Sequence, residues 1–302
     1  MKEFQNNKVN KLRLIQLLQL KLLVDIKKIT LDLGVDYFLI AGSLLGSVRH
    51  SGFIPWDSDA DIAMKRKHYN KLIDNIHLFG NDLFLQCDET DKKNKTGFAK
   101  LRLKDTVFIE SGNKFEETSC HGFYIDIFPL DKYIYRNKFM NEINHYFYRY
   151  LTRLKSFKNG KKNSSTFART IISKIICLPS IIMSLKTIIN IQKKIAQKYN
   201  NTDSNYVNNF NSKYGLEKQY MPLDIYYPPS VVSFEKHEFT APGSVDAWLK
   251  RIYGNYTKLP KKQIDYTNDL LKNYIIDFGK YSFLLGQSEK FVLNELKLDN
   301  ND

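Results

Sequence analysis

The sequence predicts a mixed α/β (α+β) fold, in which a central mixed sheet is flanked by helices and interrupted by a basic helical insertion. Three observations indicate this fold. A long helical pattern occupies the N-terminal region, short apolar runs of strand character recur up to about residue 130, and the following stretch is helical and strongly basic. With 302 residues, 43% hydrophobic and 26% charged, the chain can bury a substantial core and is typical of a soluble or peripherally bound protein.

The first expected element is a helix from Leu12 to Leu33, ended by Gly34. Its leucines and isoleucines recur near helical spacing, which predicts an apolar face packed over the sheet. Polar residues interrupt the same stretch, so we expect no signal peptide at this end of the chain. The three cysteines, Cys87, Cys120 and Cys177, lack metal-ligand spacing and are odd in number, which favours ordinary thiols in a reducing cytoplasm.

The second expected unit is a strand over residues 35–40, a turn at Gly42 and Ser43, and a helix from Leu44 onward. Glycine allows a close backbone approach, serine adds a hydroxyl, and a helix N-terminus favours negative charge. Gly42 and Ser43 are therefore candidates to bind phosphate, and Arg49 is a candidate for a bidentate phosphate contact.

Acidic residues then alternate with apolar ones. Asp59 and Asp61 are two residues apart, so in a strand they project from the same face and can share a divalent cation. The apolar residues between and after them are expected to face a core; they are Ala60, Ile62 and Met64. Strand, Gly-Ser, helix and Asp-x-Asp together predict a nucleotidyltransferase-like phosphoryl-transfer site.

The next elements are a helix over 67–79, a strand over 83–86, and a hairpin of strands 98–103 and 106–110 that turns at residues 104–105. Lys100 and Arg102 then share one face, where they either bind donor phosphates or form an exposed strand surface. In the strand over 122–130, Asp126 lies opposite the isoleucines, and a lone acid among apolar residues needs a cation or a partner. Asp131 is interpreted as a cap or turn residue.

The middle of the chain is basic. Residues 131–200 hold fifteen Lys or Arg and two acids, which accounts for +13 of the net charge of +14. This composition is typical of contact with nucleic acid or an anionic membrane, or of a solvated helical surface. The apolar run over 167–191 contains charges and a proline, so an interfacial helix and a buried helix are both favoured over a membrane-spanning one. Farther on we expect a hairpin arm over 231–239 and a helix over 246–253 ended by Gly254.

Read as GSLLGSVRHSGFIPWDSDADIAM, the acidic segment resembles the signature of the LicD family, which transfers phosphocholine to surface glycans and is related to fukutin-type sugar-phosphate transferases. KLR with Thr106, HGFYIDIFPLD and YGNY with a following Leu-Pro occur in the family's order, between about residues 18 and 260. The family usually has Asp where Ser58 stands, a departure that leaves Asp59 and Asp61 intact.

The resemblance implies a CDP-linked alcohol donor such as CDP-choline, a glycan or lipid-linked oligosaccharide acceptor, and Mg²⁺ or Mn²⁺ held by Asp59, Asp61 and Asp126. Asp126 is also the first choice for orienting or deprotonating the acceptor hydroxyl. Weaker candidates are residues that could contact choline or support the ligands: Trp56, Asp57 and His121. For Trp56 and its neighbour Phe53, cation–π contact with choline and simple packing both remain open.

Three function classes follow from these residues. A LicD-like phosphotransferase accounts for all motifs together, a metal-dependent glycosyltransferase accounts for Asp-x-Asp, and a non-catalytic membrane-binding or nucleic-acid-binding protein accounts for the basic block alone. We predict the first, with a catalytic core at 1–130, a basic insertion at 131–215 and a segment at 216–302 that completes the core. We expect no nucleic-acid partner and a peripheral location on the cytoplasmic face of an anionic membrane.

Overall fold

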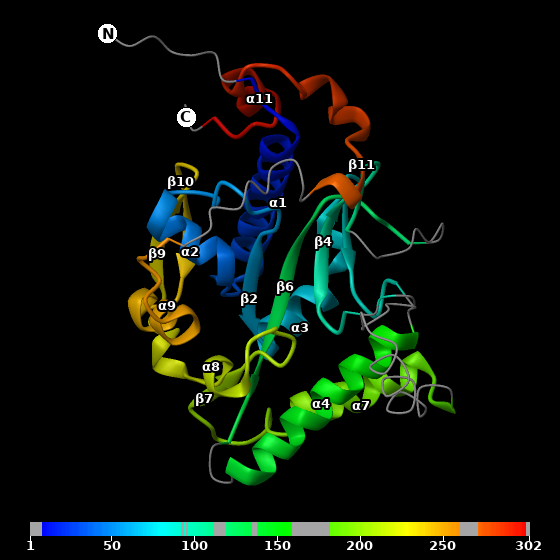
Figure 1. Ribbon diagram of the computed structural model, residues 1–302, viewed down its shortest axis with the longest axis vertical. Helices are drawn as coiled ribbons and strands as arrows, with labels where there is room; N and C mark the ends of the chain where they lie inside the picture. Colours follow the sequence, from blue (N-terminus) through cyan, green and yellow to red (C-terminus); the bar gives the residue numbers. More distant parts are fainter. Residues whose placement is uncertain are drawn as a thin grey trace. The chain divides into compact units, whose positions relative to one another are not determined.

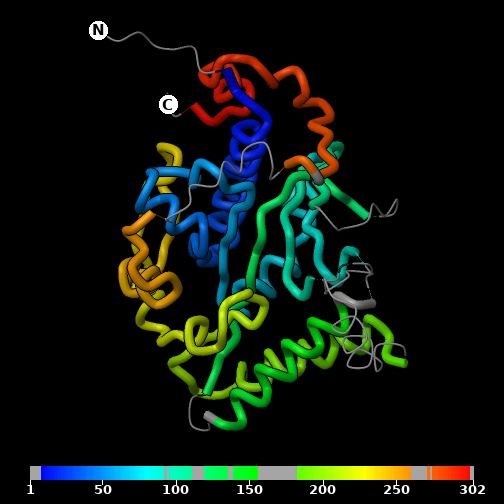
Figure 2. The backbone as a smooth tube through the Cα atoms, in the orientation of Figure 1, coloured from blue at the N-terminus to red at the C-terminus, as the bar shows by residue number. Residues whose placement is uncertain are grey.

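The computed structural model describes residues 8–91, 94, 96–110, 119–134, 138–158, 182–259 and 271–299. The chain divides into two compact units (Figures 1 and 2). We call them the sheet unit, which comprises Met1–Asp91, Phe98–Pro129 and Asp224–Asp302, and the helical unit, which comprises Lys92–Gly97 and Leu130–Leu223.

The sheet unit is built on one curved sheet whose strands follow the order β1-β2-β6-β4-β3. Strand β1 is antiparallel to β2, and β4 is antiparallel to both β3 and β6. The strands are β1 (Phe38–Leu39), β2 (Asp61–Lys65), β3 (Leu83–Gln86), β4 (Ala99–Leu103) and β6 (Tyr124–Lys132). With helices packed around this sheet, the predicted mixed α/β fold is confirmed.

Helix α1 (Lys11–Leu33) confirms the first predicted helix (Figure 1). Its N-cap is Asn10, whose side chain accepts a hydrogen bond from the Arg13 N–H, and it ends at Gly34, where φ is 60°. The apolar residues expected to face the core are fully buried. Gln16 and Gln19 are buried as well. The buried side of this helix therefore includes two polar side chains, which the apolar spacing did not predict.

Helix α2 (Ala41–His50) begins earlier than predicted. Ala41, with φ of 50°, makes the sharp turn out of β1, and Gly42 and Ser43 lie in the first turn of the helix instead of before it. The turn is therefore made by the residue before the Gly-Ser pair. The next helix, α3 (Arg66–Asp74), with the 3₁₀ helix η1 (Ile76–Phe79), confirms the helix predicted over 67–79.

The hairpin predicted over 98–110 is wrong. Strand β5 (Val107–Ile109) does not pair with β4 but with β11 (Ile275–Asp277). The reason is long-range pairing, because β3 and β6 occupy the two edges of β4. The alternation of residues predicted the strand correctly, but the strand with which β5 pairs lies more than 160 residues away along the chain.

The rest of the sheet unit is formed by the C-terminal residues. A two-stranded hairpin confirms the arm predicted over 231–239, and a helix ended by Gly254 confirms the one predicted over 246–253. The elements are η2 (Leu223–Ile225), β9 (Ser230–Phe234), β10 (His237–Ala241), α9 (Val245–Tyr253), η3 (Leu271–Asn273), η4 (Gly279–Leu284) and α11 (Glu289–Glu295).

The helical unit contains α4 (Lys138–Lys158) packed against α7 (Leu185–Gln197), with β7 (Tyr206–Asn208), α8 (Leu216–Gln219) and β8 (Met221–Pro222). Asp131 is not a cap or turn residue: it is buried in β6 opposite Asn208 and accepts a hydrogen bond from the Asn200 side chain.

Only the end of the apolar run over 167–191 can be described, since residues 167–181 and Cys177 lie outside the described residues. Within the described ranges, no helix has the length and apolar character needed to cross a bilayer.

Candidate functional site

The acidic segment is positioned by backbone hydrogen bonds to its neighbours. Asp61 is the first residue of β2: its carbonyl accepts from the Ile40 N–H at 3.2 Å, and its own N–H donates to the Ser43 hydroxyl at 2.9 Å. Asp59 precedes the strand. The three apolar residues that alternate with these acids, Ala60, Ile62 and Met64, are fully buried, as the alternation predicted.

Strand β6 brings Asp126 to the same point. The Asp126 N–H donates to the carbonyl of Ala60 at 2.9 Å, and Ala60 is the residue between Asp59 and Asp61. A single backbone hydrogen bond therefore joins the two predicted acidic motifs, which are 65 residues apart in the sequence.

Gly42 and Ser43 are directed at this acidic segment. A Cβ on Gly42 would lie 2.5 Å from Asp57 Oδ2, so the absence of a side chain lets the Asp57 carboxylate approach the first turn of α2. A helix N-terminus favours such a negative charge. Ser43 is buried and its hydroxyl accepts the Asp61 N–H. The structure thus gives this pair the role of holding the acidic segment, beside the phosphate binding predicted for it.

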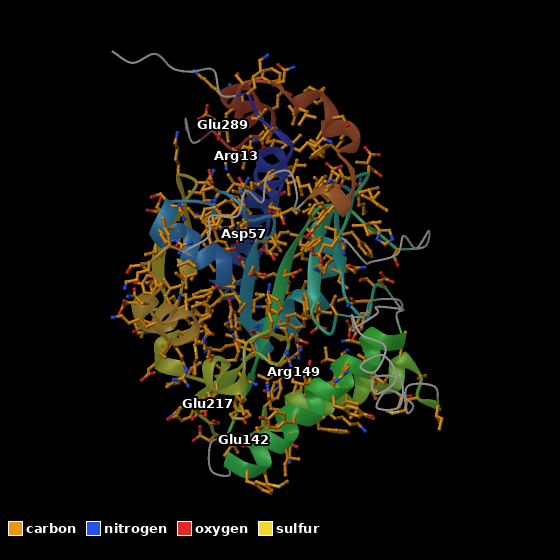
Figure 3. All side chains as sticks on the ribbon, viewed as in Figure 1. Arg13, Asp57, Glu142, Arg149, Glu217 and Glu289 are labelled. Atoms are coloured by element: carbon orange, nitrogen blue, oxygen red, sulfur yellow. The ribbon has the colours of Figure 1, made fainter. Side chains whose placement is uncertain are left out.

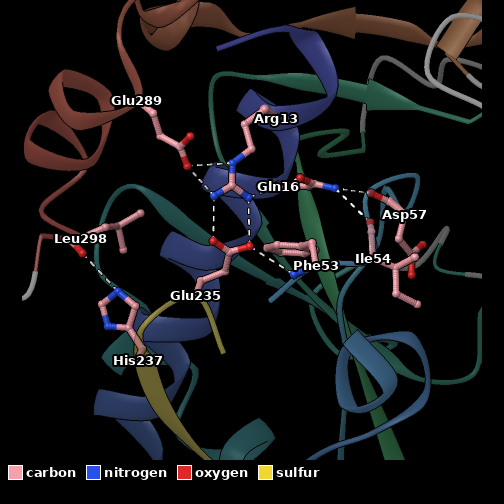
Figure 4. A network of polar contacts seen from close by, with 9 residues as sticks. All are labelled: Arg13, Gln16, Phe53, Ile54, Asp57, Glu235, His237, Glu289 and Leu298. Atoms are coloured by element: carbon pink, nitrogen blue, oxygen red, sulfur yellow. Dashed lines mark hydrogen bonds and ion pairs between the residues drawn. The ribbon is translucent and has the colours of Figure 1, made fainter. Parts of the chain in front are cut away.

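Two glutamines of α1 donate hydrogen bonds to the loop before β2, residues 54–58, which we call the acidic loop. Gln16 Nε2 donates to the carbonyl of Asp57 at 2.9 Å and to that of Ile54 at 3.3 Å (Figure 4). Gln19 Nε2 donates to the carbonyls of Ser58 at 2.7 Å and Tyr124 at 3.3 Å. The sequence reasoning missed both; the available signal was a pair of uncharged polar residues, three positions apart, inside an otherwise apolar helical stretch.

A third support comes from the β9–β10 turn. Glu235 accepts two hydrogen bonds from the Arg13 guanidinium, at 2.9 and 2.7 Å, and one from the Phe53 N–H at 3.1 Å (Figure 4). Glu289 of α11 binds the same guanidinium at 2.6 Å. Burial by itself raises the pKa of Glu235, but Arg13 outweighs it and lowers that pKa below its ordinary value. The carboxylate therefore stays ionised and joins α1, the hairpin and the loop before the acids.

Lys100 and Asp126 form the central ion pair of the site. They face each other on β4 and β6, and Lys100 Nζ lies 2.5 Å from Asp126 Oδ1. The side chains are 10% and 13% exposed, so the pair is largely removed from water. Lys100 therefore has a buried carboxylate partner, and the alternative of an exposed strand face is wrong.

Arg102 lies on the same face, two residues farther along β4. Its Nε donates to Gln86 Oε1 at 2.6 Å and its NH1 to the Gly122 carbonyl at 2.7 Å, and the guanidinium is buried. Burial lowers the pKa of Arg102. Both cations lie over the Tyr124 ring, with Lys100 Nζ at 3.5 Å and Arg102 Cζ at 4.8 Å from its centroid.

The charges around Asp126 affect its ionisation. Burial raises the pKa of the Asp126 carboxyl; Lys100 opposes the rise, and the negative charges of Asp59 and Glu110 add to it. The Tyr124 hydroxyl donates to Glu110, which lies at the end of β5. Glu110 is thus a further acid of this site, and the sequence reasoning missed it because the wrong hairpin placed that strand elsewhere.

The predicted metal site consists of three carboxylates, those of Asp59, Asp61 and Asp126. Among the residues that the structure describes, no three His, Cys, Asp or Glu side chains converge in an arrangement that could hold a metal ion. The donor chemistry nonetheless fits a hard divalent cation, since carboxylate oxygens are the ligands that Mg²⁺ prefers and Asp59 and Asp126 are close enough for one charge to raise the pKa of the other. The three-aspartate site stays a prediction.

The remaining predicted residues lie at the end of α2, in the loop that follows it, or in the segment before β6. Arg49 donates to the Tyr256 carbonyl at 3.3 Å, and burial lowers the pKa of its guanidinium. Trp56 lies against His50 with ring centroids 6.1 Å apart. Phe53 packs on Phe234 at 4.8 Å in the core, which favours the packing interpretation for Phe53. The His121 carbonyl accepts the Phe108 N–H.

Comparison with known proteins shows what the chain is similar to. Residues 34–163 match the family model described as LicD/FKTN/FKRP, nucleotidyltransferase domain. The chain is 27% identical over 252 residues to the lipopolysaccharide cholinephosphotransferase LicD of Haemophilus influenzae. The aligned region covers 80% of this chain and 89% of that protein. It is 28% identical over 143 residues to the uncharacterized protein RP689 of Rickettsia prowazekii, 46% of each chain. The predicted resemblance to the LicD family is confirmed, and the part of the chain that matches its nucleotidyltransferase domain includes the acidic segment and Asp126.

Proposed function

We propose that the protein is a phosphotransferase that moves phosphocholine, or a related alcohol phosphate, from a CDP-linked donor to a hydroxyl of a surface glycan or its lipid-linked precursor. The observation that carries the proposal is the hydrogen bond from the Asp126 N–H to Ala60, which brings Asp126 beside Asp59 and Asp61. Further support is the similarity to a cholinephosphotransferase over most of both chains.

The donor carries two anionic phosphates, and phosphoryl transfer requires their charge to be neutralised while the attacking hydroxyl is held in line. We assign Asp59, Asp61 and Asp126 to hold Mg²⁺, which when bound supplies that neutralisation. Gly42 and Ser43 keep the acidic segment against the first turn of α2, and Arg49 supplies a cation at the other end of the helix.

Asp126 is our candidate for the group that takes the proton of the acceptor hydroxyl. Burial raises its pKa, which makes the carboxylate a stronger base, and the neighbouring Lys100 opposes that rise. Because Arg102 is bound internally to Gln86 and Gly122, we assign it to hold Tyr124 and the strand in place.

The experiment is CMP release by the purified protein with Mg²⁺, a membrane glycolipid extract and one donor at a time: CDP-choline, CDP-ribitol or CDP-glycerol. We expect release with one donor that requires the extract, is abolished by EDTA, and falls by more than about 10³-fold in Asp61→Asn. The matched control is Asp74→Asn, an exposed acid at the end of α3, which should keep wild-type activity.

The alternatives give different outcomes. UDP release from a UDP-sugar, without CMP from any donor, would favour a metal-dependent glycosyltransferase. Full activity of Asp61→Asn would contradict the assigned site. We place the protein at the inner face of the cytoplasmic membrane, where the basic insertion at 131–215 would bring it to a lipid-linked acceptor, a location that fractionation of the source cells tests.

A further inference from the structure

Helix α4 of the helical unit carries apolar side chains that are buried and others that are exposed. Tyr148 packs on Phe210, and Leu151 and Leu154 pack with Ile188 of α7. These contacts stabilise the helix in its unit, because they remove apolar surface from water.

The exposed apolar side chains lie in the first part of α4, over residues 139–147. Phe139 and Tyr146 are 71% and 70% exposed, and Ile143 and Phe147 are each 44% exposed. Their positions follow the spacing i, i+4, i+7 and i+8, which places them on one side of a helix. The ring of Tyr150 stacks near that of Phe147, but Tyr150 also packs against the buried cluster around Leu154, so it is not part of this exposed surface. We call Phe139, Ile143, Tyr146 and Phe147 the α4 stripe.

Among the residues that the structure describes, the stripe differs from the exposed apolar side chains of the sheet unit. Single exposed apolar residues need no explanation, and the sheet unit has several, such as Leu31 and Phe283. In the α4 stripe, four bulky side chains follow one another over nine residues of one helix. Contiguous exposed apolar surface of this kind marks a site of interaction.

The charges beside the stripe indicate what it contacts. Arg149 and Arg153 are exposed and lie three and seven residues after Tyr146, so they flank the stripe. Glu142 is the acid nearest to them on the helix; Figure 3 labels it and Arg149. The whole stretch 131–200 carries +13 in the sequence. Aromatic and aliphatic side chains flanked by cations are the pattern of a helix that lies in the interface of an anionic bilayer.

We propose that the α4 stripe, with Arg149 and Arg153, docks the protein on an anionic lipid bilayer. The aromatic side chains insert between the head groups and the two guanidinium groups contact lipid phosphates. The inference names the surface by which the enzyme reaches a lipid-linked acceptor, and in that respect it rests on the proposed function; binding itself requires no catalysis.

The test is co-sedimentation of the full chain with phosphatidylglycerol–phosphatidylcholine vesicles and with phosphatidylcholine vesicles alone. We expect the wild type to bind the anionic vesicles, to bind the neutral ones more weakly, and to be released by salt. A variant with Phe139→Ser, Ile143→Ser, Tyr146→Ser and Phe147→Ser should lose binding by at least about tenfold. Arg149→Gln with Arg153→Gln should lose roughly fivefold per cation on anionic vesicles only.

The control variant is Leu31→Ser with Phe283→Ser, which removes exposed apolar side chains from the sheet unit and should bind as the wild type does. Because all substituted side chains are exposed, far-ultraviolet circular dichroism should be unchanged in every variant. Wild-type binding by the serine variant, or no binding by the wild type, would overturn the proposal. A wild-type dimer that the serine variant converts to a monomer would assign the stripe to a second copy of the chain and overturn it equally.

Failure of this inference and failure of the proposed function are distinguishable. Vesicle binding without CMP release from any donor contradicts the function and leaves the surface in place. CMP release without vesicle binding contradicts the surface and leaves the function.

Discussion

The acidic site of the sheet unit and the α4 stripe of the helical unit are built from different kinds of side chain. In the sheet unit, polar and charged groups are buried and bonded: Gln19 holds two backbone carbonyls, and Arg102 binds Gln86 and Gly122. In the helical unit, aromatic side chains such as Phe139 and Tyr146 lie in the solvent. A buried polar group needs its partners to be fixed, whereas an exposed apolar group contributes little to folding. The first arrangement is suited to precise chemistry and the second to association.

The largest expected effect contrasts two tyrosines of α4. Tyr148 is buried, packs on Phe210 and donates to Asn211 at 2.6 Å, so Tyr148→Ser should lower the free energy of unfolding by about 3–5 kcal/mol. Tyr146→Ser, two residues away on the exposed stripe, should change it by less than about 0.5 kcal/mol. Urea denaturation measures both. Equal losses would mean that the stripe is part of the packed structure, which would remove the contrast between the units.

The next effect concerns the buried guanidinium. Arg102→Met should destabilise the protein by about 2–4 kcal/mol, because Gln86 and the Gly122 carbonyl lose their donors inside the protein. Arg149→Met is the matched control: its guanidinium is exposed and donates to one carbonyl, of Ser212, so a change within about 0.5 kcal/mol is expected. An Arg102→Met variant with the wild-type free energy of unfolding would show that other groups replace these hydrogen bonds.

A smaller effect is expected for the support under the acidic loop. Gln19→Leu leaves the Ser58 and Tyr124 carbonyls without their donor and should cost about 1–3 kcal/mol. If Gln19 positions the acids, CMP release should fall further than the loss of folded protein explains, and the fall should appear mainly in kcat. Gln197→Leu on α7 should leave both quantities near wild type. A stability loss without a kinetic loss would limit Gln19 to a structural role.

The smallest effect is the pH dependence of the Arg13–Glu235 pair. Because the folded-state pKa of Glu235 is lowered, its contribution to stability is present above its unfolded pKa and is lost as pH falls through the lowered folded value. Glu235→Gln should cost about 1 kcal/mol at pH 7 and remove that part of the acid sensitivity. Asp25→Asn, which breaks the i,i+4 pair with Lys21, should cost less than about 0.5 kcal/mol. An unchanged acid transition in Glu235→Gln would refute the assignment.

The sequence predicted what depends on local pattern. Helix α1 was placed by its apolar spacing and by Gly34, and the core side of the acidic strand by Ala60, Ile62 and Met64. The resemblance to the LicD family was carried by short contiguous motifs, and the family model confirms it. These features need no knowledge of which segments meet in space.

Predictions from the sequence were wrong or incomplete for residues whose partners lie far away along the chain. Strand β5 alternates as a hairpin arm should, but its partner β11 lies beyond residue 270. Asp131 follows an apolar run as a cap would, but Asn200 binds it inside the helical unit. The two glutamines interrupt the apolar pattern of α1, and Glu235 follows the end of β9. Their hydrogen bonds to the segment before the acidic strand become visible only in the folded chain.

The most direct test of the account separates the two units in one assay. CMP release from the active CDP-linked donor would be measured with a bilayer-embedded glycolipid extract and with the delipidated, water-soluble glycan from it. The account predicts that Asp61→Asn is inactive with both acceptors, whereas the serine variant of the α4 stripe keeps wild-type activity with the soluble glycan and loses it with the bilayer. An Asp61→Asn protein that releases CMP at the wild-type rate would contradict the central claim that the acidic segment of the sheet unit carries the chemistry.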